Sequence, residues 1–258
     1  MLMPTVVACF KWVVDEAYIR RGAGGALDLS SVDYKIGEYD RNAIEEAVRL
    51  RDAGGGGSVI GLTVGAPESA KGVKDGLSRG MDQAIFVSDP SFKDLEPSQT
   101  AAILAEVIRT RIPQYDLVTC GEGSSDLYAQ QVGPRLAELL GIPCVCFVQK
   151  LSLEGGRLRA ERRVEDGVEV VEAPLPALVT VLPDINTPRI PGVKDTLMAG
   201  KKPVTAIKRE ELTGAFDGIL KTAAMTASSM ERTGEKLAAD AAGIARFVDS
   251  LRKSGVIK

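Results

Sequence analysis

Residues 117–141 read LVTCGEGSSDLYAQQVGPRLAELLG and pass from an apolar segment, through glycines and serines, into a helical pattern. The apolar part has the length and β-branched character of a strand that is buried on both faces. We therefore predict a strand over 117–123 and a helix over 126–141. A turn from strand to helix is the repeating unit of parallel α/β sheets.

The same alternation of strand and helix patterns runs through the first 185 residues. Because strand–helix–strand crossovers are parallel and right-handed, we expect an α/β fold with a doubly wound, mostly parallel sheet. An alternating polar and apolar pattern over 150–175, around Gly155-Gly156 and Asp166-Gly167, predicts an added antiparallel β-hairpin or meander. The other predicted strands are 5–14, 58–65, 83–89, 143–148 and 177–183, and the other helices are 41–54, 68–80 and 97–111.

In the helix predicted over 41–54, apolar residues form one stripe, and the charged residues are expected largely to face water. These charged residues are Glu45, Glu46, Arg49 and Arg51. Gly54 and the glycines that follow it are predicted to end the helix.

Composition excludes several functional classes. The 258 residues are 45% hydrophobic and carry a net charge of −3, so they can bury a full core. The absence of histidine removes the commonest general base, the Ser-His and Cys-His pairs, and imidazole metal sites. No basic stripe indicates nucleic acid binding, and no apolar run approaches the roughly 20 residues that span a bilayer. We expect a cytoplasmic protein with no metal, no catalytic residues and no membrane insertion.

The four cysteines lie in apolar, strand-like runs, and we expect buried thiols. Cys144 and Cys146 have neither the spacing of a zinc knuckle nor that of a CxxC redox motif. The other two are Cys9 and Cys120.

The pattern changes after residue 183. Residues 186–204 contain three prolines and two glycines, with room for one short helix, and 235–255 form an amphipathic helix after a weakly patterned stretch. We therefore predict a domain over 1–205 and a C-terminal arm with a helix over 206–258. The helix either folds back on its own domain, or the arm lies across a partner chain, because long loops without structure are uncommon.

The loop that follows the strand at 117–123 is the first candidate binding site, since ligands of open parallel sheets bind beyond the carboxyl ends of the strands. Its glycines would admit backbone close to a ligand, its serines and aspartate offer oxygens, and its glutamines lie inside the predicted helix. These residues are Gly121, Gly123, Ser124, Ser125, Asp126, Gln130 and Gln131. Phosphate or nucleotide binding is the hypothesis. The alternative is that Ser125 or Asp126 only caps a helix, because GEGSSD matches neither GxGxxG nor a Walker A loop.

Two further turns and the end of the first strand would converge on the same pocket. Gly37 and Asp40 precede the helix at 41–54, with Asp40 as the predicted N-cap. Gly65 ends another strand, and the first strand contributes Cys9 and Lys11.

Longer segments resemble a known family, in order and at matching spacing. VVACFKWVVD (6–15), IEEAVRL (44–50), GPRLAELLGIP (133–143), VEVVEAPLPALVTV (168–181) and INTPRIPGVKDTLMAGKKPV (185–204) are similar to the β subunit of electron transfer flavoproteins. The similarity covers nearly the whole chain, and GEGSSDLYAQQVG looks like the Fix-type branch.

The resemblance implies a Rossmann-like, adenine-nucleotide-binding fold in a heterodimer with an α subunit. An FAD would be held mainly by the α subunit and shared with this chain, and a second adenine nucleotide, either AMP or FAD, would bind in this chain. The protein would carry electrons between an acyl-CoA dehydrogenase-like flavoprotein and an acceptor such as a quinone oxidoreductase, by bifurcation where the second nucleotide is FAD. The family's nucleotide contacts fall on Cys9, Gly37, Glu38, Tyr39, Asp40, Val64, Gly121, Glu122, Gly123, Ser124, Ser125, Asp126, Ala129, Gln130, Gln131 and Val132.

Three positions depart from simple carriers of this family. Gly37-Glu38 replaces an Asn-Pro pair, and Glu16 replaces a tyrosine beside the flavin, with Tyr18 close by. Val132 replaces a threonine that binds the AMP phosphate, and valine offers no donor. Bifurcating members also have valine there, so Val132 favours FAD, while AMP stays open.

The resemblance also implies that the segment after Asn186 docks acyl-CoA dehydrogenases. Its apolar anchor would be Val193, flanked by Lys194, Lys201 and Lys202, which suits weak and salt-sensitive binding. The alternative is a structural loop with solvated lysines. The arm beyond residue 205 would wrap around the α subunit.

Two other functional classes remain. An ATP-using enzyme of the same α/β type would need a Ser-Gly-Gly-x-Asp-Ser loop or a His-Ile-Gly-His element, and the chain has neither. A stand-alone adenine-nucleotide-binding module of universal-stress type would form a homodimer without a long arm.

Overall fold

A computed structural model describes residues 3–220, 222–226 and 234–258. Nine strands form one sheet in the order β11-β10-β9-β12-β8-β1-β6-β7-β13. They are β1 Thr5–Cys9, β6 Ser58–Gly65, β7 Gln83–Ser88, β8 Leu117–Gly121, β9 Cys144–Glu154, β10 Arg157–Val164, β11 Gly167–Pro174, β12 Ala177–Val181 and β13 Val204–Lys208. The helices are α1 Glu38–Ala53, α2 Ala70–Ser78, α3 Pro97–Arg111, α4 Val132–Leu140, α5 Val193–Ala199 and α6 Ala241–Lys253. The short strands β2 Trp12–Val14 and β5 Tyr34–Ile36 pair with each other, as do β3 Arg20–Arg21 and β4 Leu27–Asp28.

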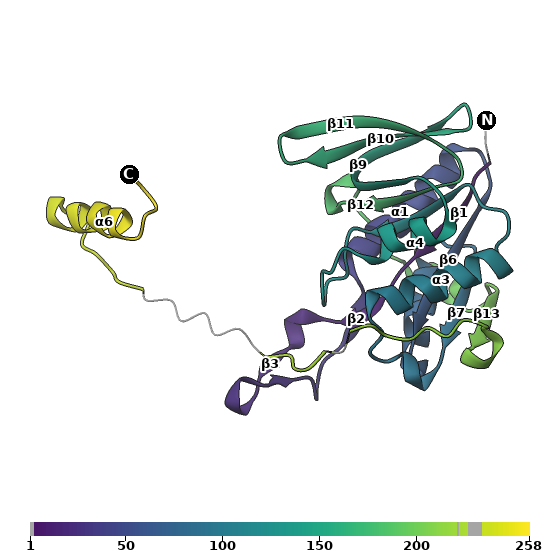
Figure 1. Cartoon of the computed structure of the whole chain (residues 1–258), viewed down its shortest axis with the longest axis horizontal. Helices are drawn as coiled ribbons and strands as arrows, with labels where there is room; N and C mark the ends of the chain where they lie inside the picture. The colour runs from purple at the N-terminus through teal and green to yellow at the C-terminus, as the bar shows by residue number, and fades with distance from the viewer. Residues whose placement is uncertain (1–2, 221, 227–233) are drawn as a thin grey trace. The chain divides into compact units, whose positions relative to one another are not determined.

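The sheet is covered on both faces, which explains its continuously apolar strands. Along β1, Val6 and Ala8 enter the core under α1 and α2, while Val7 and Cys9 enter the core under α3 and α4. The strands from β12 to β13 pair in parallel, and β9, β10 and β11 form an antiparallel meander at the opposite end of the sheet from β13 (Figure 1). This arrangement confirms the α/β class, the mostly parallel sheet and the added hairpin region.

The point where strand order reverses lies between β1 and β8. The chain runs from β1 through α1 to β6 on one side, and later returns through α3 to β8 on the other side of β1. Loops from the two carboxyl ends therefore leave toward opposite faces and open a crevice, where ligands of such sheets bind. The predicted site residues around Gly37 and Gly121 lie at this point.

The strand predicted over 5–14 and the helix predicted over 126–141 were both much too long. The strand predicted over 5–14 ends at Cys9, because the Lys11 amide N–H turns to the Asp40 carboxylate, and Trp12–Val14 pairs with β5 instead. The helix predicted over 126–141 begins only at Val132. Tyr128 and Gln130 have φ angles of 46° and 56°, which no right-handed helix accommodates.

The prediction that Glu45 and Glu46 face water was wrong, because both are buried. Glu45 accepts hydrogen bonds from the Arg189 guanidinium (Nε to Oε2, 2.7 Å), and Glu46 accepts one from the Asn186 amide (Nδ2 to Oε2, 2.9 Å). Asn42 donates to the Asn186 carbonyl at 2.9 Å. The polar side of α1 therefore binds a distant segment of the chain.

The described residues fall into two compact units, one within 1–20 and 28–224 and the other within 21–27 and 225–258. The predicted boundary at residue 205 lies inside β13. In the second unit, Asp240 is the N-cap of α6, since its carboxylate accepts from the Gly243 amide at 2.7 Å. Ile244 and Phe247 are exposed on this helix.

In the described part of the chain, no helix combines the length and apolarity needed to cross a membrane.

We predict that Asn186→Ala lowers the free energy of unfolding by about 2 kcal/mol or more, because the buried Glu46 carboxylate loses its hydrogen-bond donor. Urea unfolding of the full chain measures this change. Thr187→Ala is the matched control, since Thr187 is the next residue and is exposed. Equal unfolding midpoints for the two variants would contradict the role assigned to Asn186.

Candidate nucleotide site

Asp40 joins three segments at the carboxyl ends of β1 and β8. The Lys11 amide donates to Asp40 Oδ2 at 2.8 Å, and the Gly121 amide donates to Asp40 Oδ1 at 3.3 Å. Asp40 lies in the first turn of α1, whose N-cap is Gly37. The prediction that Asp40 caps this helix was therefore wrong, because its carboxylate binds the ends of two neighbouring strands instead.

Burial changes the charge of this carboxyl group. Asp40 is 8% exposed, and burial raises its pKa to about 7, against the opposing effect of the Lys11 and Gly121 amides. The group is therefore partly protonated near neutral pH. A carboxyl with such a pKa in a crevice is a feature of functional sites.

The glycines of this region allow the start of α1 to approach β8 closely. A Cβ atom on Gly121 would lie 2.7 Å from both Asp40 Oδ1 and Tyr39 Cβ, and one on Gly123 would lie 2.8 Å from Tyr128 Cδ2. The space beside these two glycines is thus filled by the chain's own side chains. Their first role is to let segments of this chain pack together.

One polar atom in the crevice lacks a partner. Ser125 Oγ is buried and forms no hydrogen bond with the described residues. It lies 3.5 Å from the position that a Cβ atom on Gly37 would occupy, at the N-terminus of α1. A buried hydroxyl without a partner is costly, so a ligand oxygen at this place would stabilise it. The start of a helix favours an anionic group such as phosphate.

The loop from Glu122 to Gln131 is held in a strained conformation. The Tyr128 hydroxyl donates to the buried Glu122 carboxylate at 2.7 Å, and this bond raises the pKa of Tyr128 to about 12. The rings of Tyr128 and Tyr39 lie 5.4 Å apart between centroids. Backbone strain of this kind is found at binding sites and costs about 1–3 kcal/mol per residue. Tyr128 was missed by the sequence analysis, although it is the one aromatic residue in GEGSSDLYAQQ.

Lys11 places a positive charge beside this loop. Its Nζ lies 2.7 Å from Asp126 Oδ2, and both side chains are partly exposed. Burial alone would raise the pKa of Asp126, but the Lys11 charge and hydrogen bond outweigh it and hold that pKa below its usual value. Asp126 therefore binds a lysine, and the alternative that it only caps a helix does not hold, because α4 begins at Val132. Lys11, noted as a strand-end residue, belongs to the site by position.

The remaining predicted residues are placed less closely around Asp40. Cys9 is buried at the end of β1, and Val64 lies on the neighbouring strand, beyond the Cys9–Leu62 pair. Gln131 is the N-cap residue of α4, and Val132 is the first residue of that helix. The prediction that this helix starts at Asp126 was therefore wrong. Gln131 Oε1 accepts from Arg135 Nε at 3.1 Å. The structure thus brings the Gly37–Asp40 and Gly121–Asp126 segments together and leaves the others at the edges.

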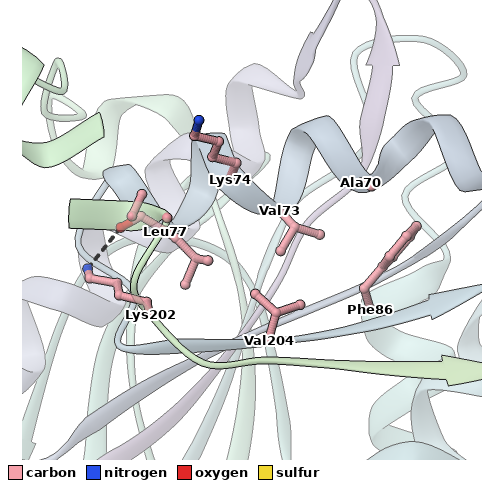
Figure 2. A pocket seen from close by; sticks show the side chains of 9 residues that line it. Ala70, Val73, Lys74, Leu77, Phe86, Lys202 and Val204 are labelled. Atoms are coloured by element: carbon pink, nitrogen blue, oxygen red, sulfur yellow. Dashed lines mark hydrogen bonds between the residues drawn. The ribbon is translucent and has the colours of Figure 1, made fainter. Parts of the chain in front are cut away.

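A cavity of about 210 Å³ lies elsewhere, between α2, β13 and α5 (Figure 2). Its walls are mainly apolar, with Val73, Phe86 and Val204 facing inward. Lys202 closes one side by donating to the carbonyls of Leu77 (2.9 Å) and Met81 (2.6 Å). Lys202 therefore stabilises the end of α2.

The predicted docking residue Val193 is 81% exposed at the start of α5. Ile190 and Leu197 are also largely exposed, and the sequence analysis named neither. Lys194 and Lys201 are exposed beside them. An apolar group of this kind with two neighbouring lysines is unusual on a surface that faces only water.

Only half of the cysteines are buried as expected. Cys9 and Cys120 are buried, whereas Cys144 is exposed and Cys146 is half-buried. On β9, Val145 and Val148 enter the core beside α1, and the two cysteines lie on the other face. An apolar run predicted burial, but it could not show how far the helices cover each face.

The chain matches a known protein family over most of its length. Residues 25–212 match the electron transfer flavoprotein domain. The matched range spans well over half of the chain and includes α1, β8, the strained loop and α5.

We predict that Asp40 makes stability depend on pH. Because its folded pKa is raised, the folded state keeps a proton that the unfolded state has lost between about pH 4 and pH 7, so stability falls as pH rises through this range, by at most about 1.4 kcal/mol per unit. Asp40→Asn should give a shallower slope in urea unfolding between about pH 5 and pH 8. The exposed Asp33→Asn variant should keep the original slope, and an unchanged slope in Asp40→Asn would refute this assignment.

Proposed function

The chain belongs to the electron transfer flavoprotein family, and from that premise we propose that it is the β subunit of a heterodimeric electron carrier of the Fix-type branch. It would pass electrons between acyl-CoA dehydrogenase-like flavoproteins and a downstream acceptor such as a quinone oxidoreductase. The observation that carries the proposal is the family match over residues 25–212, which includes Asp40 and Gly121 of the crevice.

The residues at the crevice fit an adenine nucleotide. Ser125 Oγ is a buried hydroxyl without a partner in the described chain, and the first turn of α1 has amide groups without helical acceptors. Lys11 supplies a positive charge, and the Tyr39–Tyr128 pair offers aromatic surface. We assign Ser125 and the start of α1 to the phosphate, and the tyrosine pair to the ring system.

The crevice contains two acid groups, Asp40 and Asp126. It suits an anionic ligand only if one of these two carboxyl groups is neutral. Asp40 lies in the first turn of α1, where a negative charge would repel phosphate. Its pKa of about 7 lets the carboxyl take up a proton when a phosphate enters, and the amides of Lys11 and Gly121 would still hold it in place. Asp126 stays ionised because Lys11 compensates its charge.

A bound flavin would supply reversible one-electron and two-electron transfer. This chain would bind and orient the nucleotide and shield it from water, with Asp40, Lys11 and Asp126 setting the charge around it. We propose that the second nucleotide is FAD, because Val132 at the start of α4 has no hydroxyl to donate to an AMP phosphate. A second FAD would make the heterodimer a bifurcating one.

We further propose that residues 190–197 dock the dehydrogenase and that the C-terminal arm, residues 206–258, binds the α subunit. Support for the first comes from the exposed Ile190, Val193 and Leu197, with Lys194 and Lys201 nearby. Support for the second comes from the exposed apolar side chains Ile244 and Phe247 on α6.

Expression of the chain with its α subunit should give a yellow 1:1 complex. Acid release and chromatography of the nucleotides should yield FAD twice per heterodimer and no AMP. One FAD with one AMP would overturn the assignment of FAD from Val132. A stable, colourless homodimer of the lone chain that binds ATP would instead indicate the universal-stress type of module.

The Ser125→Ala variant should lose at least half of the nucleotide held by this chain, because the ligand loses a hydrogen bond worth about 1 kcal/mol. Ser152→Ala on β9 is the control and should keep its full content. Equal nucleotide content in both complexes would remove Ser125 from the site.

Val193→Asp should lower the rate constant for electron transfer from a dehydrogenase at least about tenfold at limiting concentration, since an apolar anchor typically contributes 1.4 kcal/mol or more. Stopped-flow reduction of the complex measures this rate. Val170→Asp on β11, a similarly exposed valine, should leave it unchanged. An equal loss in both variants would contradict docking through Val193.

A further inference from the structure

Cys144 and Cys146 form a pair of thiols on one face of β9. Their Sγ atoms lie 3.6 Å apart. Cys144 is exposed and Cys146 is half-buried, so reagents in solution can reach the pair. Neither residue belongs to the crevice around Asp40.

A β-bulge shapes the backbone at this pair. Val145 and Val148 of β9 pair with Val179 and Val181 of β12, so β9 uses one residue more than its neighbour across this step. The extra length includes Phe147, whose φ of 61° is rare for an aromatic residue. The Phe147 amide donates to Thr180 Oγ1 at 3.1 Å. Strained bulges of this kind re-aim side chains and are frequent near functional groups.

The surroundings of the two thiols shift their pKa values in opposite directions. The hydrogen bond from Cys144 lowers the pKa of Cys146 to about 6, against the opposing effect of burial, and the Thr180 hydroxyl and the Arg162 charge add to this lowering. The same contact raises the pKa of Cys144. At neutral pH, Cys146 is therefore the thiolate and Cys144 keeps its proton. A low-pKa cysteine beside a second thiol is the arrangement of redox-responsive sites.

The other two cysteines provide an internal comparison. Cys120 contacts Cys9, and this contact together with burial raises the pKa of Cys120 well above its usual value. Both residues are buried. They should therefore resist oxidants that reach Cys146.

We propose that Cys144 and Cys146 form a dithiol site that a hydroperoxide oxidises to an intramolecular disulfide. The inference rests on the spacing, exposure and bulge of the pair, and it holds whether or not the proposed electron carrier function is correct.

The reaction balances in two steps. The Cys146 thiolate attacks one oxygen of the peroxide, the O–O bond breaks, and the departing oxygen takes up a proton, which leaves Cys146 as a sulfenic acid. The Cys144 sulfur then attacks the Cys146 sulfur, its proton leaves with the hydroxyl group as water, and the S–S bond forms. Two thiols and one hydroperoxide thus give one disulfide, one alcohol (water in the case of hydrogen peroxide) and one water.

The exposure of the pair makes the product reducible. Residues two apart in a regular strand have Cα atoms about 6.6 Å apart, within the range of about 4.4–6.8 Å that disulfides span, so the bond can close. Exposed disulfides are readily reduced by thiols. The site would return to its dithiol form when the oxidant is removed.

Peptide mapping tests the proposal on the full-length chain. Trypsin releases Cys144 and Cys146 together in residues 136–150, and releases Cys9 and Cys120 in other peptides, 1–11 and 112–135. After treatment with hydrogen peroxide and an alkylating reagent, we expect peptide 136–150 to lose two hydrogen atoms and to escape alkylation until a dithiol reductant is added. Without oxidant, iodoacetamide should modify Cys146 at neutral pH at least about tenfold faster than Cys120.

Variants separate the two roles. Cys144→Ser should leave a sulfenic acid on Cys146 that dimedone traps, and Cys146→Ser should abolish the reaction. Arg162→Gln should move the pH midpoint of Cys146 alkylation upward, whereas Arg159→Gln, on the same strand, should not. Circular dichroism of each variant confirms folding, and Cys146→Ala replaces Cys146→Ser if the latter unfolds.

Three results would overturn the proposal. The first is a Cys146 alkylation rate no greater than that of Cys120. The second is oxidation that yields only disulfides between chains. The third is a peptide 136–150 in which both cysteines stay reduced after treatment with peroxide, whether the peroxide is consumed or remains in excess.

Discussion

The structure depends on the hydrogen bonds of one buried carboxyl group. Asp40 holds the end of β1 through the Lys11 amide and the end of β8 through the Gly121 amide, and it does so from the first turn of α1. These are the two strands between which the order of the sheet reverses. A parallel sheet opens at that point because its loops leave toward opposite faces. Asp40 links the ends of the two strands across this point, and Gly121 is needed there because any Cβ would collide with Asp40 and Tyr39.

Helix α1 connects this crevice to the segment that carries the exposed apolar side chains. Its N-terminus forms the crevice, and its buried polar side holds Asn186 and Arg189 through Asn42, Glu45 and Glu46. A segment that binds a partner must present apolar side chains to water without collapsing onto its own domain. Here the hydrogen bonds and the ion pair to Glu45 fix the base of the segment, so that Ile190 and Val193 stay exposed. The N-terminal part of α1 thus contacts both the crevice and the segment with the exposed apolar side chains.

In this protein, which has no histidine, the immediate surroundings of each titratable group set its charge. Burial leaves Asp40 partly protonated, while Lys11 keeps Asp126 ionised a short distance away. At the thiol pair, a neighbouring sulfur, a hydroxyl and a guanidinium favour the thiolate of Cys146, whereas the contact with Cys9 and burial raise the pKa of Cys120 and keep it protonated. Groups of the same chemical type therefore differ in charge, because they differ in exposure to water and in the hydrogen-bond donors and charges near them.

The resemblance of longer segments indicated the electron transfer flavoprotein family, and the match over residues 25–212 confirms that family. The sequence by itself determined the α/β class, the parallel strands and the antiparallel addition, because hydrophobic periodicity and turn residues are local signals. It also placed Gly37, Asp40 and Gly121 at one edge of the sheet, since parallel strands end together. Only the tertiary structure decided what those residues do: the Asp40 carboxyl binds distant amides, Glu45 and Glu46 are buried by a segment about 140 positions away, and Cys146 is reachable from water. These features depend on contacts between residues far apart in the chain, and a single sequence carries no local pattern for them. The late start of α4 has the same origin, because the contacts of Tyr128 with Glu122 and Tyr39 hold the loop in a conformation that helical periodicity does not reveal.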